Sequence, residues 1–269
     1  MTASTHSCTM PSPGPGASGE SAPQRRPPAA PPTSVEVNRI LAPVTALGPG
    51  RRLGLWVQGC SLRCPGCASR DTWAPGEGTR IGVEQLAQEL AARIKADSLT
   101  GLTITGGEPL DQAEALAGVV SRLRSLMSPE RPEPTGPPAP GGVSFGDRQE
   151  PEPRELDVLL FTGYAASSPS SPRDQARRRA GALWDLLDAV VAGPYRRDLP
   201  SDQPLVASSN QRLIVLTPGW TPGPGGSMQV MVADGELTMV GLPRPGDLDR
   251  LEAHLCERGV YLGGASWRS

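Results

Sequence analysis

The sequence predicts an α/β fold built on a mainly parallel sheet. Short apolar runs rich in β-branched residues alternate with longer segments whose apolar residues recur at helical spacing. This alternation is typical of βαβ units, whose consecutive strands lie parallel in one sheet. The 269 residues suffice for one domain of about 200 residues with a sizeable core. In such folds ligands bind beyond the carboxyl ends of the strands, so we expect functional residues there.

The expected elements follow one another with short breaks between them. Strands are expected at Val35–Leu47, Leu53–Val57, Leu102–Thr105, Leu156–Thr162, Ala189–Ala192 and Leu213–Leu216, and a hairpin at Met228–Ala233 and Glu236–Val240 around Asp234-Gly235. Helices are expected near 83–95, near 111–127, over Leu183–Val190 and around Leu248–Leu255, where apolar residues recur every three or four positions.

Glycine and proline are unevenly distributed, and this sets the domain organisation. The chain holds 32 glycines and 31 prolines, close to twice ordinary usage. Eight prolines fall within residues 1–33 and eight more within 128–154, with few large apolar residues beside them. Such stretches bury too little surface to offset the entropy of ordering them. We therefore expect a disordered tail over 1–33 and one domain over 34–269 with a disordered insertion at about 128–154.

Charge and hydropathy argue against nucleic acid and membranes as partners. The net charge of −2 does not favour a broad surface for a polyanion. No run approaches 18 consecutive apolar residues, and the first residues have neither a cationic start nor an apolar segment of a secretory signal. The expected location is cytoplasmic, where cysteines stay reduced.

Three of the five cysteines form a tight group after the second expected strand. Cys60, Cys64 and Cys67 are spaced C-x3-C-x2-C, whereas Cys8 lies in the tail and Cys256 about 190 residues further along. A closed zinc site needs four nitrogen or sulfur ligands, and no fourth ligand is local. Three thiolates suit a [4Fe–4S] cluster with one open iron. The favoured reading is therefore iron–sulfur, with zinc or a degenerate site as the alternatives.

A second motif ends the next strand of the pattern. Gly106 and Gly107 have no side chains and let a ligand approach the backbone closely. Glu108 supplies an anionic acceptor for an ammonium group, and Pro109 fixes the turn that leaves the strand. Since both motifs follow neighbouring parallel strands, we expect them on the same rim of the sheet.

The two motifs together resemble those of the radical S-adenosylmethionine (SAM) superfamily. Trp73, Phe161-Thr162-Gly163-Tyr164, Ala192-Gly193-Pro194-Tyr195 and Ser208-Ser209-Asn210-Gln211-Arg212 are similar to stretches of its activating-enzyme branch, in particular the anaerobic ribonucleotide reductase activating proteins. The resemblance implies a partial (β/α) barrel. It also implies that Cys60, Cys64 and Cys67 hold the cluster and that Gly66 and the Gly106–Pro109 motif contact SAM. At position 66 the superfamily commonly has an aromatic residue, so here only backbone contributes.

The implied activity is reductive cleavage of SAM to a 5′-deoxyadenosyl radical. The cluster and SAM carry this chemistry, so no side chain is named as a catalytic acid or base. The implied partners are a glycyl radical enzyme as protein substrate and a low-potential electron donor such as flavodoxin or ferredoxin. Two alternatives stay open: a radical SAM enzyme that modifies a small molecule or peptide, and a non-catalytic iron–sulfur module.

Overall fold

The computed structural model describes residues 33–128, 156–168, 174–223, 228–233, 236–244 and 246–261. Apart from Thr33 and Ser128, the predicted disordered tail and insertion lie outside these residues. The strands are β1 (Ser34–Val44), β2 (Arg52–Val57), β3 (Thr79–Gly82), β4 (Gly101–Gly106), β5 (Asp157–Thr162), β6 (Ala189–Ala192), β7 (Arg212–Val215), β8 (Met228–Ala233) and β9 (Glu236–Gly241). The α-helices are α1 (Val83–Ala96), α2 (Ala113–Met127), α3 (Gln175–Ala180) and α4 (Asp247–Glu257), and the 3-10 helices are η1 (Arg70–Thr72), η2 (Pro109–Gln112) and η3 (Gly181–Leu186).

Seven strands form one mixed sheet in the order β3-β1-β2-β4-β5-β6-β7. The central strands β2, β4, β5 and β6 are parallel, whereas β1, β3 and β7 pair antiparallel at the two sides. The predicted α/β class with a mainly parallel centre is confirmed. Because the four central strands run the same way, their carboxyl ends share one rim, where β2 is followed by the cysteines and β4 by Glu108.

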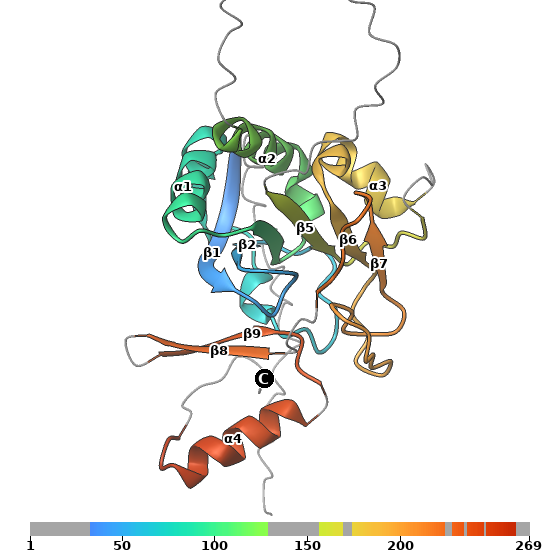
Figure 1. Cartoon of the computed structure of the whole chain (residues 1–269). Coiled ribbons are helices and arrows are strands. Elements are labelled where there is room, and N and C mark those ends of the chain that lie inside the picture. Colours follow the sequence, from blue (N-terminus) through green and yellow to red (C-terminus); the bar gives the residue numbers. More distant parts are fainter. Residues whose placement is uncertain are drawn as a thin grey trace, which may run out of the picture.

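The helices cover one face of the sheet. Figure 1 shows α1 and α2 side by side above the strands. Leu55 and Val57 of β2 belong to the main core with the apolar faces of α1 and α2, for example Leu90 and Leu116. Strand residues alternate between the two faces, so Trp56, between Leu55 and Val57, points to the opposite side of the sheet. That opposite face is left for other elements to cover.

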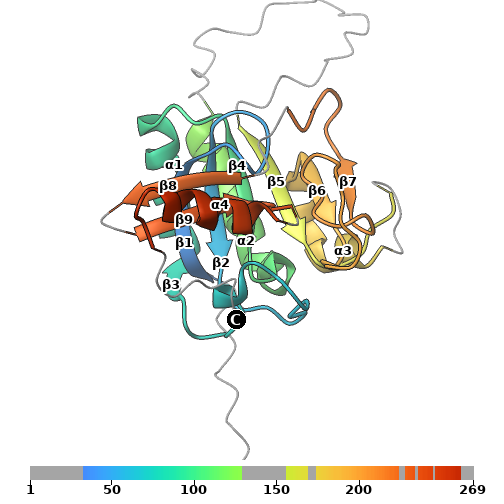
Figure 2. The ribbon, with the colours of Figure 1, turned by 90° about the horizontal axis from the view of Figure 1, so that it is seen from below.

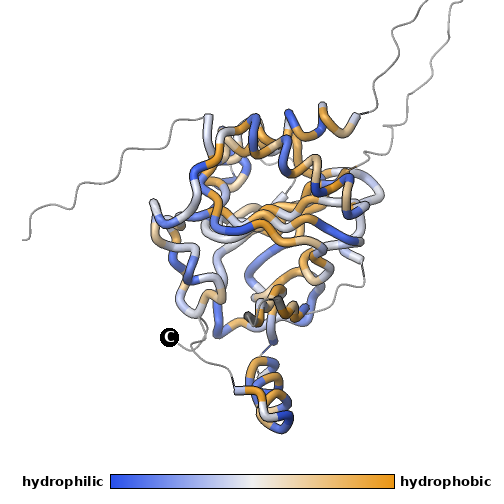
Figure 3. Tube along the Cα trace, turned by 90° about the vertical axis from the view of Figure 1, so that its left-hand side faces the viewer, coloured by the Kyte–Doolittle hydropathy of each residue, from blue (hydrophilic) through white to orange (hydrophobic). Residues whose placement is uncertain are grey.

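The carboxyl-terminal hairpin covers part of the opposite face. Figure 1 shows β8 and β9 below the sheet with α4 beyond them, and Figure 2 shows α4 in front of the hairpin. Val240 of β9 packs in a small core with Val44, Leu47 and Trp56. The tube in Figure 3 shows α4 set apart from the main body, with apolar residues on part of its surface. None of the helices in the described ranges is long and apolar enough to cross a bilayer.

A buried arginine ties three strands together at the rim away from the cysteines. Arg52, at the start of β2, is fully buried. Its guanidinium donates to Thr103 Oγ1 at 2.6 Å and to the Leu102 carbonyl at 2.8 Å, and pairs with Asp157 at 2.6 Å. A buried charge is tolerated only when its hydrogen bonds are made, and here β4 and β5 supply them. The network fixes the relative register of β2, β4 and β5.

The structure differs from the predicted elements in four places. The first strand ends at Val44 instead of Leu47, because Leu47 turns inward and its carbonyl accepts the Thr103 hydroxyl at 2.7 Å. The helix expected over Leu183–Val190 is the 3-10 helix η3, which ends where Leu187 becomes extended and β6 begins. The short elements β3 and α3 have too few residues for a periodic signal, and the sequence did not predict them.

Candidate functional site

The cysteine loop, residues 59–73, follows β2, and two backbone hydrogen bonds join its two ends. The Gly59 N–H donates to the Thr72 carbonyl at 2.8 Å, and the Cys60 N–H donates to the Trp73 carbonyl at 3.1 Å. The intervening residues therefore form a closed loop that presents all three cysteines. The 3-10 helix η1 leads to the second end of the loop. Trp73, whose structural role the sequence did not indicate, accepts one of the two hydrogen bonds there through its carbonyl.

The Gly106-Gly107-Glu108 segment is hydrogen-bonded directly to the base of this loop. The Gly107 N–H donates to the Val57 carbonyl and the Glu108 N–H donates to the Gly59 carbonyl, both at 2.8 Å. A Cβ on Gly107 would overlap the Gly59 carbonyl and lie 3.0 Å from the Thr72 carbonyl oxygen. Gly106 has φ +103° and equally little room beside Val57. Both glycines thus let two backbone segments approach each other, and the approach of a ligand to them stays a prediction.

Glu108 is turned inward and holds the ends of two strands together. Its side chain is only 1% exposed. Oε1 accepts the Leu110 N–H at 2.9 Å and the Thr162 hydroxyl at 2.7 Å, and Oε2 accepts the Gly163 N–H at 2.8 Å. Burial raises the pKa of Glu108 to about 7 although these three hydrogen bonds lower it. Three of about four acceptor positions are used, so one is left for an ammonium group.

The three cysteines are free and half-buried. Cys60 Sγ accepts the Arg63 N–H, and Cys67 Sγ accepts the Ser69 N–H, each at 3.4 Å. Burial raises the pKa of both thiols, so each favours its protonated form unless a cation binds it. A metal centre that binds the sulfurs would supply that positive charge and displace the protons.

The number of local thiols distinguishes between the two candidate centres. A closed zinc site needs four nitrogen or sulfur ligands, whereas the loop supplies three cysteines. Three thiolates can hold a [4Fe–4S] cluster with one iron left open. The donor set therefore fits the cluster better than it fits a closed zinc site.

A second network, which the sequence did not reveal, fastens the loop to β5 and η2. Asp111 accepts the Ser61 N–H at 2.9 Å and the Ser61 hydroxyl at 3.0 Å. The Tyr164 hydroxyl also donates to Asp111, at 3.1 Å. The sequence gives no sign of this role for Asp111, because a lone acidic residue after a turn is a common helix-start signal. Its position three residues after Glu108 places it under Ser61, beside Cys60.

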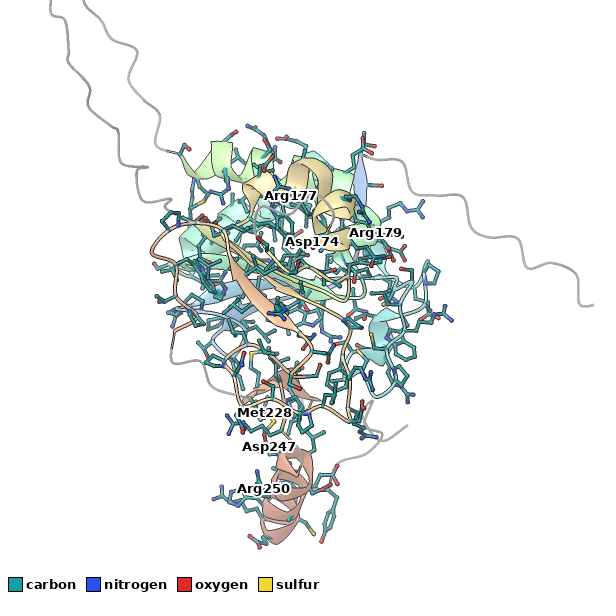
Figure 4. All side chains as sticks on the ribbon, turned by 90° about the vertical axis from the view of Figure 1, so that its right-hand side faces the viewer. Asp174, Arg177, Arg179, Met228, Asp247 and Arg250 are labelled. Carbon is teal, nitrogen blue, oxygen red and sulfur yellow. The ribbon has the colours of Figure 1, made fainter. Side chains whose placement is uncertain are left out.

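Arg179 extends this network to α3. Its guanidinium lies 4.1 Å from the Tyr164 ring centroid and 3.6 Å from Asp111. Arg177 stacks on Trp184 in the same helix-turn region, and Figure 4 shows both arginines on α3. Two members of the run Arg177-Arg178-Arg179 are therefore engaged in ring contacts. Cys256 is exposed on α4, which has no buried residues.

Hydrogen bonds join the Ala192–Tyr195 stretch to the Ser208–Arg212 stretch. Gln211 Nε2 donates to the Gly193 carbonyl at 2.9 Å, and its Oε1 accepts the Ala207 and Ser208 N–H groups at 3.1 Å. Asn210 donates to the Pro194 carbonyl at 2.7 Å. Asn210 and Gln211 therefore have a structural role, because they fasten the segment before β7 to the end of β6.

A cavity of about 1170 Å³ opens beside these segments. Its lining includes Cys60, Cys64, Gly66, Cys67, Gly106, Gly107 and Glu108, and from the other side residues 237–244 of the hairpin region. Pro109 is not part of the lining; it is buried and begins η2. The structure thus gathers seven of the eight predicted site residues around one cavity, and their roles as ligands stay predictions.

The chain is similar to several known proteins. The family model for a 4Fe-4S single cluster domain matches residues 46–132. The anaerobic ribonucleoside-triphosphate reductase-activating protein of Enterobacteria phage T4 is 28% identical over 174 residues, 64% of this chain and 88% of the relative. The pyruvate formate-lyase-activating enzyme of Listeria monocytogenes is 41% identical over 75 residues, 27% of this chain and 30% of that enzyme. The solved structure of QueE from Escherichia coli aligns with a TM-score of 0.33 and 14% identity over 51% of this chain and 57% of that one.

One further relative decides the family. The anaerobic ribonucleoside-triphosphate reductase-activating protein of Vibrio cholerae is 32% identical over 150 residues, 55% of this chain and 76% of the relative. The match to a [4Fe–4S] domain covers the cysteine loop and the Gly106–Pro109 motif. The chain therefore belongs to the family of anaerobic ribonucleoside-triphosphate reductase-activating proteins, radical SAM enzymes whose cofactors are a [4Fe–4S] cluster and S-adenosylmethionine.

Proposed function

We propose that this chain cleaves SAM reductively and installs a glycyl radical on a partner protein. Cys60, Cys64 and Cys67 would hold the cluster, and the cluster together with SAM would supply one-electron cleavage of a carbon–sulfur bond and abstraction of a hydrogen atom from the target. The observation that carries the proposal is the direct attachment of the cysteine loop to Gly107 and Glu108 on one cavity wall.

The chain's own residues have three tasks in this proposal. Cys60, Cys64 and Cys67 provide the thiolates, leaving one iron open to SAM. Glu108 faces the SAM ammonium with its remaining acceptor position, while its other hydrogen bonds keep the carboxylate from rotating. Gly66, which has φ +79°, contributes backbone to the cavity wall. Pro109 acts indirectly, by setting the turn after Glu108.

The hairpin side of the cavity supports exclusion of water. Leu237, Met239 and Leu242 line the cavity opposite the cysteines. Apolar walls keep a reactive radical from solvent and side reactions. The partial (β/α) barrel implied by the resemblance belongs to the same proposal, since a sheet curved toward the hairpin would enclose this space.

The partner is proposed from the relatives. Those relatives are named for activating an anaerobic ribonucleoside-triphosphate reductase or pyruvate formate-lyase, which are proteins. A protein substrate of the glycyl radical class is therefore the favoured target, and a flavodoxin or ferredoxin the favoured electron donor. A cytoplasmic location fits both, because such donors and reduced thiols occur there.

The test is an anaerobic assay of reconstituted, reduced protein with SAM. We expect 5′-deoxyadenosine to form slowly alone, and a protein-based glycyl radical to appear in electron paramagnetic resonance when an anaerobic ribonucleoside-triphosphate reductase is added. Deoxyadenosine that rises with a small molecule, without a radical on any protein, would favour the small-molecule alternative. A loaded and reduced cluster that cleaves no SAM would favour the non-catalytic module.

A further inference from the structure

The cavity wall next to Cys67 carries a cation that has no partner among the described residues. Four arginines line the cavity: Arg39, Arg70, Arg197 and Arg244. Arg39 pairs with Asp71 and stacks on Trp56, and Arg70 stacks on Trp73. Arg244 lies 3.8 Å from Asp202. Within the residues that the structure describes, Arg197 makes no ion pair, hydrogen bond or ring contact.

Arg197 lies close against the cysteine loop because Gly66 has no side chain there. A Cβ built on Gly66 would lie 3.4 Å from Arg197 Cδ and 3.6 Å from its Nε. The arginine stem therefore rests on the loop backbone one residue before Cys67. Its neighbour Arg196 points elsewhere: it pairs with Asp198 at 2.6 Å and is not part of the cavity lining.

The charges along the wall match the two ends of an amino acid. Glu108 is a buried acid with one acceptor position left, and Arg197 is a cation whose donors bind none of the described residues. The methionine part of SAM carries one ammonium and one carboxylate on the same carbon. A guanidinium binds a carboxylate through two parallel N–H···O bonds, which fixes orientation as well as adding energy.

We infer that Arg197 binds the carboxylate of SAM, opposite the ammonium contact of Glu108. This inference rests on the proposed function, because it assumes SAM in this cavity. It adds a positioning residue that the sequence motifs did not indicate. The pair of contacts selects a zwitterionic amino acid end and orients it toward the cysteine loop.

A comparison of SAM with decarboxylated SAM tests whether Arg197 contacts the carboxylate or affects ligand binding in general. Anaerobically reconstituted full-length protein is titrated with SAM and with decarboxylated SAM, which keeps the sulfonium, the amine and the adenosine. We expect R197Q to bind SAM about tenfold more weakly than wild type, the usual size for loss of a charge-assisted hydrogen bond. Its affinity for decarboxylated SAM should change less than about twofold by the same reasoning.

Two further variants serve as controls. R196Q should bind both ligands as wild type does, because Arg196 is already paired outside the cavity. R197K keeps the charge without the planar fork and should fall between wild type and R197Q. Iron content and circular dichroism of each variant check that the cluster and fold are retained.

Equal weakening of both ligands in R197Q, or no change in either, would overturn the inference. The inference would also be overturned if the ratio of the affinity for SAM to the affinity for decarboxylated SAM were no larger in wild type than in R197Q. The proposed function is read separately by 5′-deoxyadenosine formation. If wild type cleaves SAM but R197Q still discriminates fully between SAM and decarboxylated SAM, the carboxylate contact of Arg197 is rejected and the proposed activity is not.

Discussion

At the residue scale, Glu108 joins the β4 and β5 ends through a carboxylate that is almost completely buried. Its three hydrogen bonds come from two different segments, so its charge state affects both folding and ligand binding. The negative charge of nearby Asp111 also raises the pKa of Glu108. A carboxyl group of this kind is more easily protonated in the folded than in the unfolded protein.

This predicts a pH dependence of stability in the ligand-free protein. The pKa of Glu108 is raised from 4.5 to about 7, so the folded state binds the extra proton between these values. The free energy of unfolding should fall as pH rises from about 4.5 to 7 and then level, by on the order of 3 kcal/mol. Urea unfolding at pH 5 and pH 8 measures this, and E108Q should lack this component. An equal pH dependence in E108Q would contradict it.

Gly107 is the second residue whose substitution gives a sharp result. A Cβ there meets the Gly59 carbonyl, whereas a Cβ on Gly82 meets nothing closer than 4.0 Å. G107A should lower the free energy of unfolding by about 1–3 kcal/mol, as overpacking does, and should reduce the iron retained after reconstitution. G82A is the matched control and should keep both near the wild-type values. Normal iron content in G107A would show that the loop base tolerates displacement.

At the element scale, the cysteine loop is a preformed part of the fold and not a free connection. Its two ends are joined through Gly59 and Cys60, and Asp111 fixes Ser61 from η2. Gln58 donates to the Ala74 carbonyl at 2.7 Å, and Gln112 donates to the Gln58 carbonyl at 3.0 Å. Because the loop is fastened on both sides, single cysteine replacements should remove a ligand without unfolding the domain.

Reconstitution tests this expectation. Wild type should bind about four irons and four sulfides per chain. Replacing Cys60, Cys64 or Cys67 by alanine should abolish the cluster absorbance, while circular dichroism stays unchanged. C256A should behave as wild type, because Cys256 is exposed on α4. A cluster that survives C64A and is lost in C256A would contradict the assignment.

At the scale of the whole molecule, the cavity has walls from two separate packing units. The main core lies between the sheet and α1 and α2, and a smaller core joins Val240 to Trp56 and Val44 on the other face. The hairpin therefore depends on few apolar contacts. Few buried contacts make a segment the first to open in native-state fluctuations.

Disturbing the smaller core should open the cavity and leave the sheet folded. Val240 is 2% exposed, whereas Val232 on the same hairpin is 72% exposed. V240S should cost about 2 kcal/mol locally and remove hydrogen-exchange protection from β8 and β9, while β2, β4, β5 and β6 keep theirs. V232S should change neither. Loss of protection throughout the sheet in V240S would show that hairpin and sheet unfold as one unit.

The sequence by itself determined most of the strand and helix order, the parallel centre of the sheet and the two motifs that line the cavity, but not β3 or α3. These follow from local patterns: apolar periodicity for the elements, and the spacing of Cys60, Cys64 and Cys67 followed by Gly106-Gly107-Glu108 for the site. Both motifs end neighbouring parallel strands, so βαβ topology alone brings them to one rim.

Only the tertiary structure decided how those residues are held. Asp111 under Ser61, Tyr164 beneath Arg179 and Arg197 over Gly66 are contacts between segments far apart in the chain, and none has a periodic or spacing signal. The same holds for Gly107, which must lack a side chain because the Gly59 backbone approaches it closely. Local sequence encodes secondary structure and short motifs, whereas the partners of a polar side chain depend on which surfaces packing brings together.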